Sequence, residues 1–232
     1  MSRAYRALAF TSDVEEAQRA YGSRAAQQRL DRHLGPAQEH EPLGAAEQEF
    51  LALQDGFYVA SISRTGWPYV QFRGGPAGFV RTPDPHTVAW ADFRGNRQYI
   101  TTGNVRHDPR VALIFLDSAR QARLKVYGRM RVTDVRGQAG PSTLEVPGYR
   151  GVVERDVAID VAAFDWNCDQ HIEPRYSIDQ LSEQLSPLRD RLASLEAENA
   201  RLRAASSGPR QGRGDRLEDL EPAVLQAQSF DA

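Results

Sequence analysis

Hydrophobic and polar positions follow a helical period in the first part of the chain. Up to about residue 56 apolar side chains recur every three or four positions, and Ser12 with Glu15 has the spacing of a capping box. Gly-Pro and Glu-Pro pairs between residues 34 and 42 interrupt the pattern. A second short helix is then predicted over Glu47 to Leu53.

From residue 57 the pattern changes to the period of two that is typical of strands. One hairpin is predicted by FYVASIS and PYVQFR around the turn RTGW, and another by GFV and TVAWAD, with both prolines of TPDPHT in its turn. A buried strand is indicated by VALIFLD, and an alternating apolar and basic strand by RLKVYGRMRVTDV. A turn and a short helix fit RGNRQYITTGN, whereas GVVERDVAIDVAAFDW fits a strand or a helix. So many strands joined by short turns favour an antiparallel barrel.

The C-terminal part shows a heptad pattern. Ser177 and Gln180 again have capping-box spacing. The alternating a and d positions are Ile178, Leu181, Leu185, Leu188, Leu192, Leu195, Asn199 and Leu202. This narrow stripe favours a helix that pairs with its twin, while the alternative is an amphipathic helix packed on its own barrel. Pro187 either starts a new helix or kinks this one.

These patterns divide the chain into four parts. They are a helical extension (1–45), a barrel domain (46–176), an amphipathic or coiled-coil helix (177–204) and a flexible tail (205–232).

Composition narrows the class of protein. The 232 residues are 41% hydrophobic, enough for a packed core, and the net charge of −2 argues against general nucleic-acid or anionic-membrane binding. The single cysteine, Cys168, excludes an intrachain disulfide. With no signal-peptide pattern and no long apolar run, the sequence predicts a cytoplasmic protein. The five scattered histidines have no metal-ligand spacing, so no metal is expected.

Four stretches occur in the order of a known family. They are GWPYVQFRGGPAGF, WADFRGNRQYITTGN, DPRVALIFLD and RLKVYGRMRV, with a further likeness in NCDQHIEPR. Together they resemble the FMN-binding split-barrel family related to pyridoxamine 5′-phosphate oxidase, in particular its flavin-nucleotide-binding subgroup. The resemblance implies a mainly β fold with flanking helices, a split antiparallel β-barrel, to which this chain adds its heptad helix. It also implies FMN as cofactor and a homodimer with the FMN sites at the subunit interface.

The resemblance also implies cofactor-binding residues. A strand beneath the flavin ring would be formed by Tyr69, Val70, Gln71, Phe72 and Arg73. A phosphate-binding turn would be formed by Asp92, Arg94, Gly95, Asn96, Arg97 and Gln98. Guanidinium groups suit a phosphate because they donate charged hydrogen bonds in pairs. The alternatives are an ordinary strand with an exposed arginine and a solvated charged turn.

Three further residues are implied with less specific roles. Lys125 would lie near the pyrimidine edge of the flavin, where a cation stabilises the reduced form, although a plain surface lysine fits as well. Gln170 and His171 would reach the cofactor from the partner subunit. Trp67 and Trp90 are expected to be packing residues.

The expected function is an FMN-dependent oxidoreductase acting on a small molecule, with no residue assigned as acid or base. The C-terminal arginine- and tryptophan-bearing motif of the true oxidases has no equivalent after Arg175, which argues against vitamin B6 oxidation. The alternative is a sensor or carrier that binds flavin or haem without catalysis, and a deazaflavin is a third possible cofactor.

Overall fold

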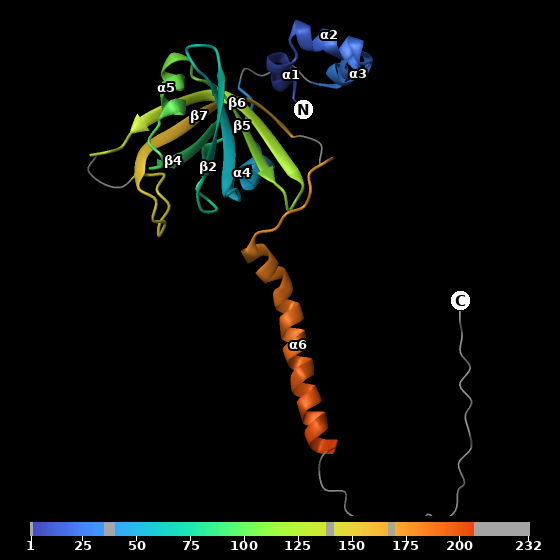
Figure 1. Ribbon diagram of the computed structural model, residues 1–232. Coiled ribbons are helices and arrows are strands. Elements are labelled where there is room, and N and C mark those ends of the chain that lie inside the picture. The colour runs from blue at the N-terminus through green and yellow to red at the C-terminus, as the bar shows by residue number, and fades with distance from the viewer. Residues whose placement is uncertain (1, 35–39, 138–141, 167–169, 207–232) are drawn as a thin grey trace, which may run out of the picture. The chain divides into compact units, whose positions relative to one another are not determined.

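The computed structural model describes residues 2–34, 40–137, 142–166 and 170–206. Residues 1–176 form one compact unit and residues 177–232 a second one. The first unit holds the sheet and five helices, and the second holds one long helix (Figure 1).

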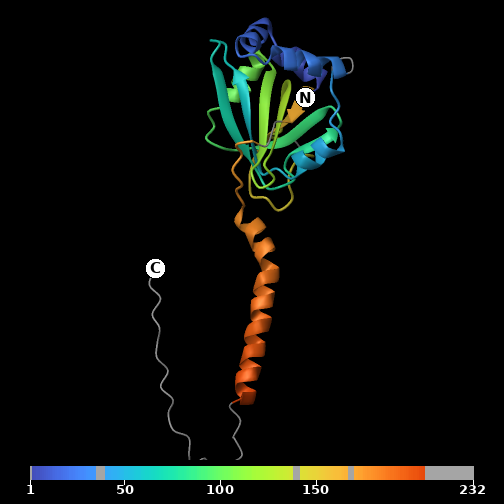
Figure 2. The ribbon, with the colours of Figure 1, turned by 90° about the vertical axis from the view of Figure 1, so that its right-hand side faces the viewer.

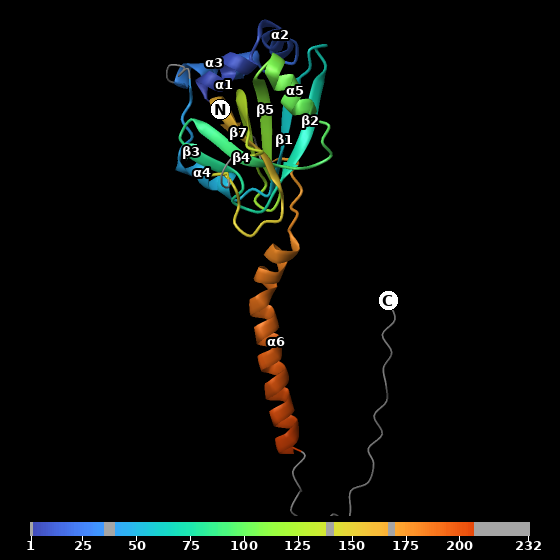
Figure 3. The ribbon, with the colours of Figure 1, turned by 90° about the vertical axis from the view of Figure 1, so that its left-hand side faces the viewer.

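The first unit is built on an antiparallel sheet of seven strands. These are β1 (Gly56–Ile62), β2 (Pro68–Gly74), β3 (Arg81–Asp84), β4 (Thr87–Phe93), β5 (Arg110–Asp117), β6 (Ala122–Asp134) and β7 (Val153–Trp166). Their order is β2-β1-β5-β6-β7-β4-β3, so β2 and β3 are the two edges (Figure 3). The long strands β6 and β7 pair along their length, with a bulge beside Gly128. A Cβ atom at Gly128 would lie 2.6 Å from the carbonyl oxygen of Asp160, so the bulge requires glycine.

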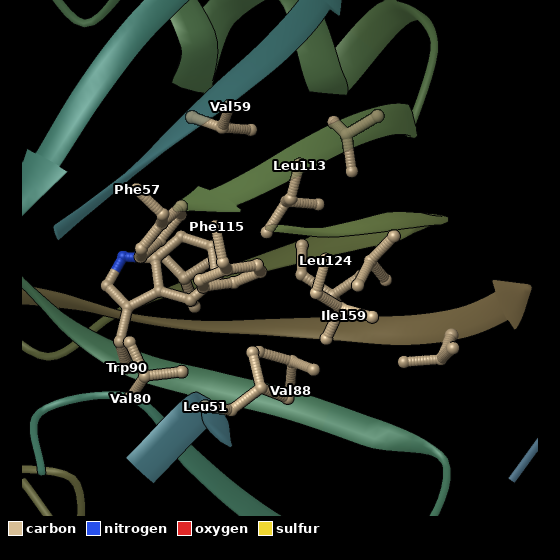
Figure 4. Packing of buried hydrophobic residues seen from close by; sticks show 14 of the residues in the cluster. Leu51, Phe57, Val59, Val80, Val88, Trp90, Leu113, Phe115, Leu124 and Ile159 are labelled. Carbon is tan, nitrogen blue, oxygen red and sulfur yellow. The ribbon is translucent and has the colours of Figure 1, made fainter. Parts of the chain in front are cut away.

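The core lies on the inner face of this curved sheet. Phe57 packs edge-on against Trp90, with ring centroids 4.9 Å apart, and lies 4.7 Å from the ring of Phe115. Leucine, isoleucine and valine side chains from β1, β5, β6 and β7 surround these rings (Figure 4). Each inner residue is two positions from the next along its strand, which is the alternation that the sequence shows.

Five helices flank the sheet. They are α1 (Arg3–Ala9), α2 (Ser12–Ala20), α3 (Arg24–His33), α4 (Ala45–Ala52) and α5 (Ile100–His107). Helix α1 contacts β7, α4 contacts β3, and α5 contacts β1 and β6. Figure 2 shows α1, α2 and α3 together at one end of the strands. The predicted mainly β fold with flanking helices, a split antiparallel barrel, is therefore confirmed.

Several local predictions are corrected. Helix α2 is capped by Thr11, whose hydroxyl accepts a bond from the amide of Val14, instead of by Ser12. Pro83 lies inside β3, which tolerates it because β3 is an edge strand with an irregular register. Strand β5 is buried on one face only. Trp67 is 76% exposed in the first hairpin turn, so it is not a packing residue, whereas Trp90 is.

The second unit is α6 (Ile178–Ser206), a continuous helix. Its capping box is confirmed, since the side chains of Ser177 and Gln180 each accept a bond from the backbone amide of the other. Pro187 lies within the helix and does not begin a new one. Residues 205 and 206 belong to α6 instead of to the tail, and the rest of the predicted tail lies outside the described residues.

Candidate functional site

A cavity of about 330 Å³ opens at one end of the sheet and is rich in arginine. Its walls come from the ends of β2 and β4, the segment 94–97, the start of α5 and part of β7. We call it the arginine cavity. Its charged lining residues are Arg73, Asp92, Arg94, Arg97 and Arg155.

Buried ion pairs organise this cavity. Asp92 and Arg155 are opposite each other on β4 and β7, and the guanidinium of Arg155 donates to Asp92 at 2.7 and 2.9 Å. Arg73 reaches the other oxygen of Asp92 at 3.2 Å from β2. Arg155 also donates to Glu154 at 3.0 Å, and Arg94 donates to Glu154 at 2.9 Å. Three arginines thus share two carboxylates, and the fourth lining arginine, Arg97, is paired with neither. Together the four arginines and two carboxylates leave two positive charges in excess.

Glu154 is ionised in this environment. Its residue surface is 1% exposed, and burial by itself would raise the pKa of the carboxyl. Hydrogen bonds from Arg94 and Tyr99 and the charge of Arg155 outweigh burial, and the net pKa of Glu154 is lowered. The carboxylate therefore holds the arginines in place at neutral pH.

The segment before α5 has an unusual backbone. Arg97 and Tyr99 both adopt positive φ angles, 62° and 54°, which cost non-glycine residues about 1–3 kcal/mol each. Tyr99 is held by its hydroxyl, which donates to Glu154 at 3.1 Å, and by its ring, which lies 4.7 Å from the guanidinium carbon of Arg155. This conformation places Arg97 at the cavity, with its Nε donating to the Tyr99 hydroxyl at 3.4 Å.

One polar atom in the cavity wall has no partner. Trp90 is 1% exposed and lines the cavity, yet its indole nitrogen makes no hydrogen bond to any described residue. A buried donor without an acceptor is costly, about 1–3 kcal/mol. A ligand oxygen in the cavity could accept this bond, so the donor set fits an oxygen-rich anion such as the phosphate end of FMN.

The structure brings together just over half of the predicted cofactor residues. Those lining the arginine cavity are Gln71, Phe72, Arg73, Asp92, Arg94, Asn96 and Arg97. Tyr69 and Gln98 do not line it. Gln170 and His171 are exposed and do not line it either, although their expected role concerned the partner subunit.

Val70 and Lys125 lie on the outer face of the sheet instead. Both line a cavity of about 180 Å³ that also includes Tyr5 and Tyr127. The ammonium of Lys125 is 3.5 Å from Asp165 and 4.8 Å from the ring centroid of Tyr5. Burial raises the pKa values of Tyr5 and Tyr127, whose rings stack 5.1 Å apart. Lys125 thus has protein partners away from the arginine cavity.

The sequence analysis missed Tyr99, Glu154 and Arg155. A signal was present for Arg155, because it is in phase with Val157 and the other inward residues of β7. A charged residue at an inward position of an alternating strand indicates a buried polar site.

The described part of the chain has neither a metal-binding cluster nor a membrane-spanning helix. No group of three or more histidine, cysteine or acidic side chains there could hold a metal ion. None of the described helices combines the length and the apolar character needed to span a bilayer.

A family model matches part of this chain. Residues 43–141 match the family model described as pyridoxamine 5′-phosphate oxidase. A search of curated proteins found no match.

Solved structures similar to this chain come from several bacteria. HupZ of Group A Streptococcus is 14% identical with a TM-score of 0.40, over 58% of this chain and 100% of HupZ. A protein related to general stress protein 26, from Clostridium acetobutylicum, is 12% identical with a TM-score of 0.40, over 58% and 93% of the two chains. A pyridoxamine 5′-phosphate oxidase-related, FMN binding protein from Nostoc punctiforme is 9% identical with a TM-score of 0.36, over 52% and 78%.

The matched residues contain β1 to β6 and most of the arginine cavity. Over residues 43–141, this chain is similar to the pyridoxamine 5′-phosphate oxidase family.

Proposed function

We propose that this protein is an FMN-dependent oxidoreductase that holds the phosphate of its cofactor in the arginine cavity. The observation that carries the proposal is the excess of two positive charges around the cavity. A phosphate monoester has close to two negative charges at neutral pH, so the two are complementary.

Individual residues have distinct parts in this proposal. Arg97 is exposed in the lining of the cavity and would donate to the phosphate oxygens, while Arg73 and Arg94 would approach from two sides. Asp92 and Glu154 keep the guanidinium groups apart and oriented before any ligand arrives. The first turn of α5, whose N-terminus has no side-chain cap, adds backbone donors that favour an anion. Bound FMN would supply hydride or single-electron chemistry, for which the protein provides orientation and electrostatics.

The second part of the proposal is a homodimer formed through the outer face of β1, β2 and β5. Cross-strand partners Tyr58 with Phe72 and Ala60 with Val70 lie on this face, and Ile114 is opposite Tyr58. Val70 and Phe72 are 59% and 56% exposed. A contiguous apolar sheet face marks an interaction surface. Because Phe72 also lines the arginine cavity, a partner on this face would border the flavin site.

Titration with FMN and riboflavin tests the phosphate site. Arg97→Ala should weaken FMN binding about 10- to 100-fold, the range of a hydrogen bond to a charged group. Riboflavin has no phosphate, so its affinity should stay the same in this variant. Arg64→Ala, in the exposed turn between β1 and β2, is the matched control and should bind FMN as the unmodified protein does.

Two outcomes would contradict the proposal. Unchanged FMN affinity in Arg97→Ala would mean that the phosphate does not bind in this cavity, and an equal loss for riboflavin would mean that the variant disturbs the fold.

Reduction of bound flavin by NADH or NADPH, followed by reoxidation in air, would support an enzyme. A Soret band in the isolated protein would indicate haem instead.

A further inference from the structure

Helix α6 presents an apolar stripe that the flavin site does not explain. Its residues are Ile178, Leu181, Leu185, Leu188, Leu192, Leu195 and Leu202, which are between 39% and 82% exposed. Together with Asn199, they recur at alternating intervals of three and four residues along the 29 residues of the helix. A stripe with this period forms the seam of a left-handed coiled coil.

We infer that α6 pairs with the α6 of a second copy, in parallel and in register. The inference commits to the second copy because the flanking charges complement an identical helix. At the g and e′ positions, Arg191 would face Glu196 of the second copy, and Glu198 would face its Arg203. Each pair occurs twice in a symmetric dimer.

The same charges argue against an antiparallel pair. The antiparallel register that matches all apolar layers joins Leu192 to Leu188, which brings each Arg191 beside the other Arg191. That register also buries Asn199 against Leu181. Leucine leaves the buried amide without a partner, which is costly. In the parallel register Asn199 meets Asn199, the arrangement that commonly fixes a two-stranded pair.

Pro187 is compatible with this seam. With Leu185 at an a position and Leu188 at a d position, Pro187 occupies the c position, on the side away from the partner helix. Proline removes one backbone hydrogen bond, to the carbonyl of Glu183, and an exposed carbonyl can bind water instead. The helix therefore continues through Pro187 without disturbing the contact surface.

Parallel pairing has a consequence for the rest of the chain. Each residue 1–176 unit is joined to the N-terminal end of its α6, so two such units would be tethered at the same end of the coiled coil. A weak association of their sheet faces would then become intramolecular, with a high effective concentration. The inference does not depend on flavin binding.

Disulfide trapping in the full chain tests orientation and register. In a Cys168→Ser background, Leu202→Cys should form an interchain disulfide upon mild oxidation, because parallel pairing brings the two positions together. A mixture of Leu202→Cys and Ile178→Cys chains should give no mixed 178–202 disulfide. Mixed disulfides would overturn the parallel assignment, and no disulfide at all would overturn the pairing.

Two sets of variants identify the contact. Leu192→Asp, on the seam, should lower the yield of the 202–202 disulfide at least tenfold, while Ser194→Asp, on the outward c position, should leave it unchanged. Arg191→Glu should lower it about twofold, and Glu196→Arg in the same chain should restore it. Residues five apart do not face each other on one helix, so rescue can come only from the second copy. Equal effects of the two aspartates, or no rescue, would contradict the inference.

Discussion

The two faces of the sheet around β2 depart from the usual distribution of residues in opposite ways. The inner face buries charges: Asp92 is 4% exposed, and Arg155 is 8% exposed. The outer face exposes apolar side chains such as Val70 and Phe72. Along β5 and β6, by contrast, the alternation of apolar and polar residues agrees with the fold. Local exceptions in a consistent fold are where function is expected, and here the exceptions meet at Phe72.

The two faces of the sheet are therefore suited to different binding partners. The carboxylates of the inner face are already paired with arginines of the same chain, and only the excess of positive charge is left without an acidic partner among these pairs. On the outer face, the apolar side chains of β1 and β2 lie next to one another, and Val70 and Phe72 remain more than half exposed. The inner face thus suits a small anion, and the outer face suits a protein surface.

The largest expected effect comes from breaking the inner network. Asp92→Ala leaves Arg155 buried with one carboxylate fewer and Arg73 with none among the ion pairs described, and should cost about 3–5 kcal/mol of unfolding free energy. Urea denaturation measures it. Asp160→Ala is the matched control on β7, because Asp160 and Arg131 form an exposed ion pair, and its cost should stay below about 1 kcal/mol. Similar costs for both variants would mean that the inner network is not special.

This network also shows where sequence reasoning reached its limit. The turn that carries Arg94, Asn96 and Arg97 was predicted from the family resemblance, which rests on a contiguous stretch of sequence. Its partner Arg155 is 63 residues from Asp92 and becomes a neighbour through the pairing of β4 and β7. Periodicity did not decide whether residues 151–166 form a strand, so that pairing could not be predicted.

The second limit of the sequence reasoning was the assignment of side chains to the two faces of the sheet. Residues 69–73 were treated as one strand beneath a ring, but alternation directs Gln71 and Arg73 inward and Val70 and Phe72 outward. The alternation itself was visible in the sequence. The neighbourhood of Lys125 could not be predicted either, because Tyr5 of α1 lies against its ammonium from 120 residues earlier in the chain.

A smaller effect is expected on the outer face. Val70→Glu should weaken dimerisation about 10- to 100-fold, because a carboxylate would be buried against an apolar partner surface. Sedimentation should be measured in a Leu192→Asp background, so that α6 does not hold the chains together. Thr65→Glu, in the exposed turn between β1 and β2, adds the same single negative charge outside this face and should leave the dimer intact.

The same experiment tests two hypotheses separately: that the outer face forms the dimer, and that FMN binds at the dimer interface. FMN affinity should fall together with dimerisation in Val70→Glu if the partner borders the cofactor. Loss of the dimer with unchanged FMN affinity would keep the interface and remove the cofactor from it. A dimer that tolerates the glutamate would contradict the assignment of this face.

The smallest expected effect is a change in acid sensitivity caused by Glu154. Its pKa in the folded chain is below the ordinary value of 4.5, so the unfolded chain binds more protons as the pH falls through that range. The carboxylate therefore stabilises the fold above pH 4.5, and this contribution is lost as the pH falls toward its folded pKa. The titration of one group changes the unfolding free energy by at most about 1.4 kcal/mol per pH unit.

Glu154→Gln removes the titrating group, so the unfolding free energy should fall less steeply with decreasing pH than in the unmodified protein. Arg94→Ala deletes one of the hydrogen bonds that lower this pKa, and it should shift the slope part of the way in the same direction. Urea denaturation at a series of pH values from 6 to 3 measures both slopes. The ionised pairs lie on the inner face, whereas Val70 lies on the apolar outer face. Val70→Glu should therefore not make the unfolding free energy less steeply dependent on pH. Identical slopes in Glu154→Gln and the unmodified protein would show that the buried carboxylate does not couple the network to pH.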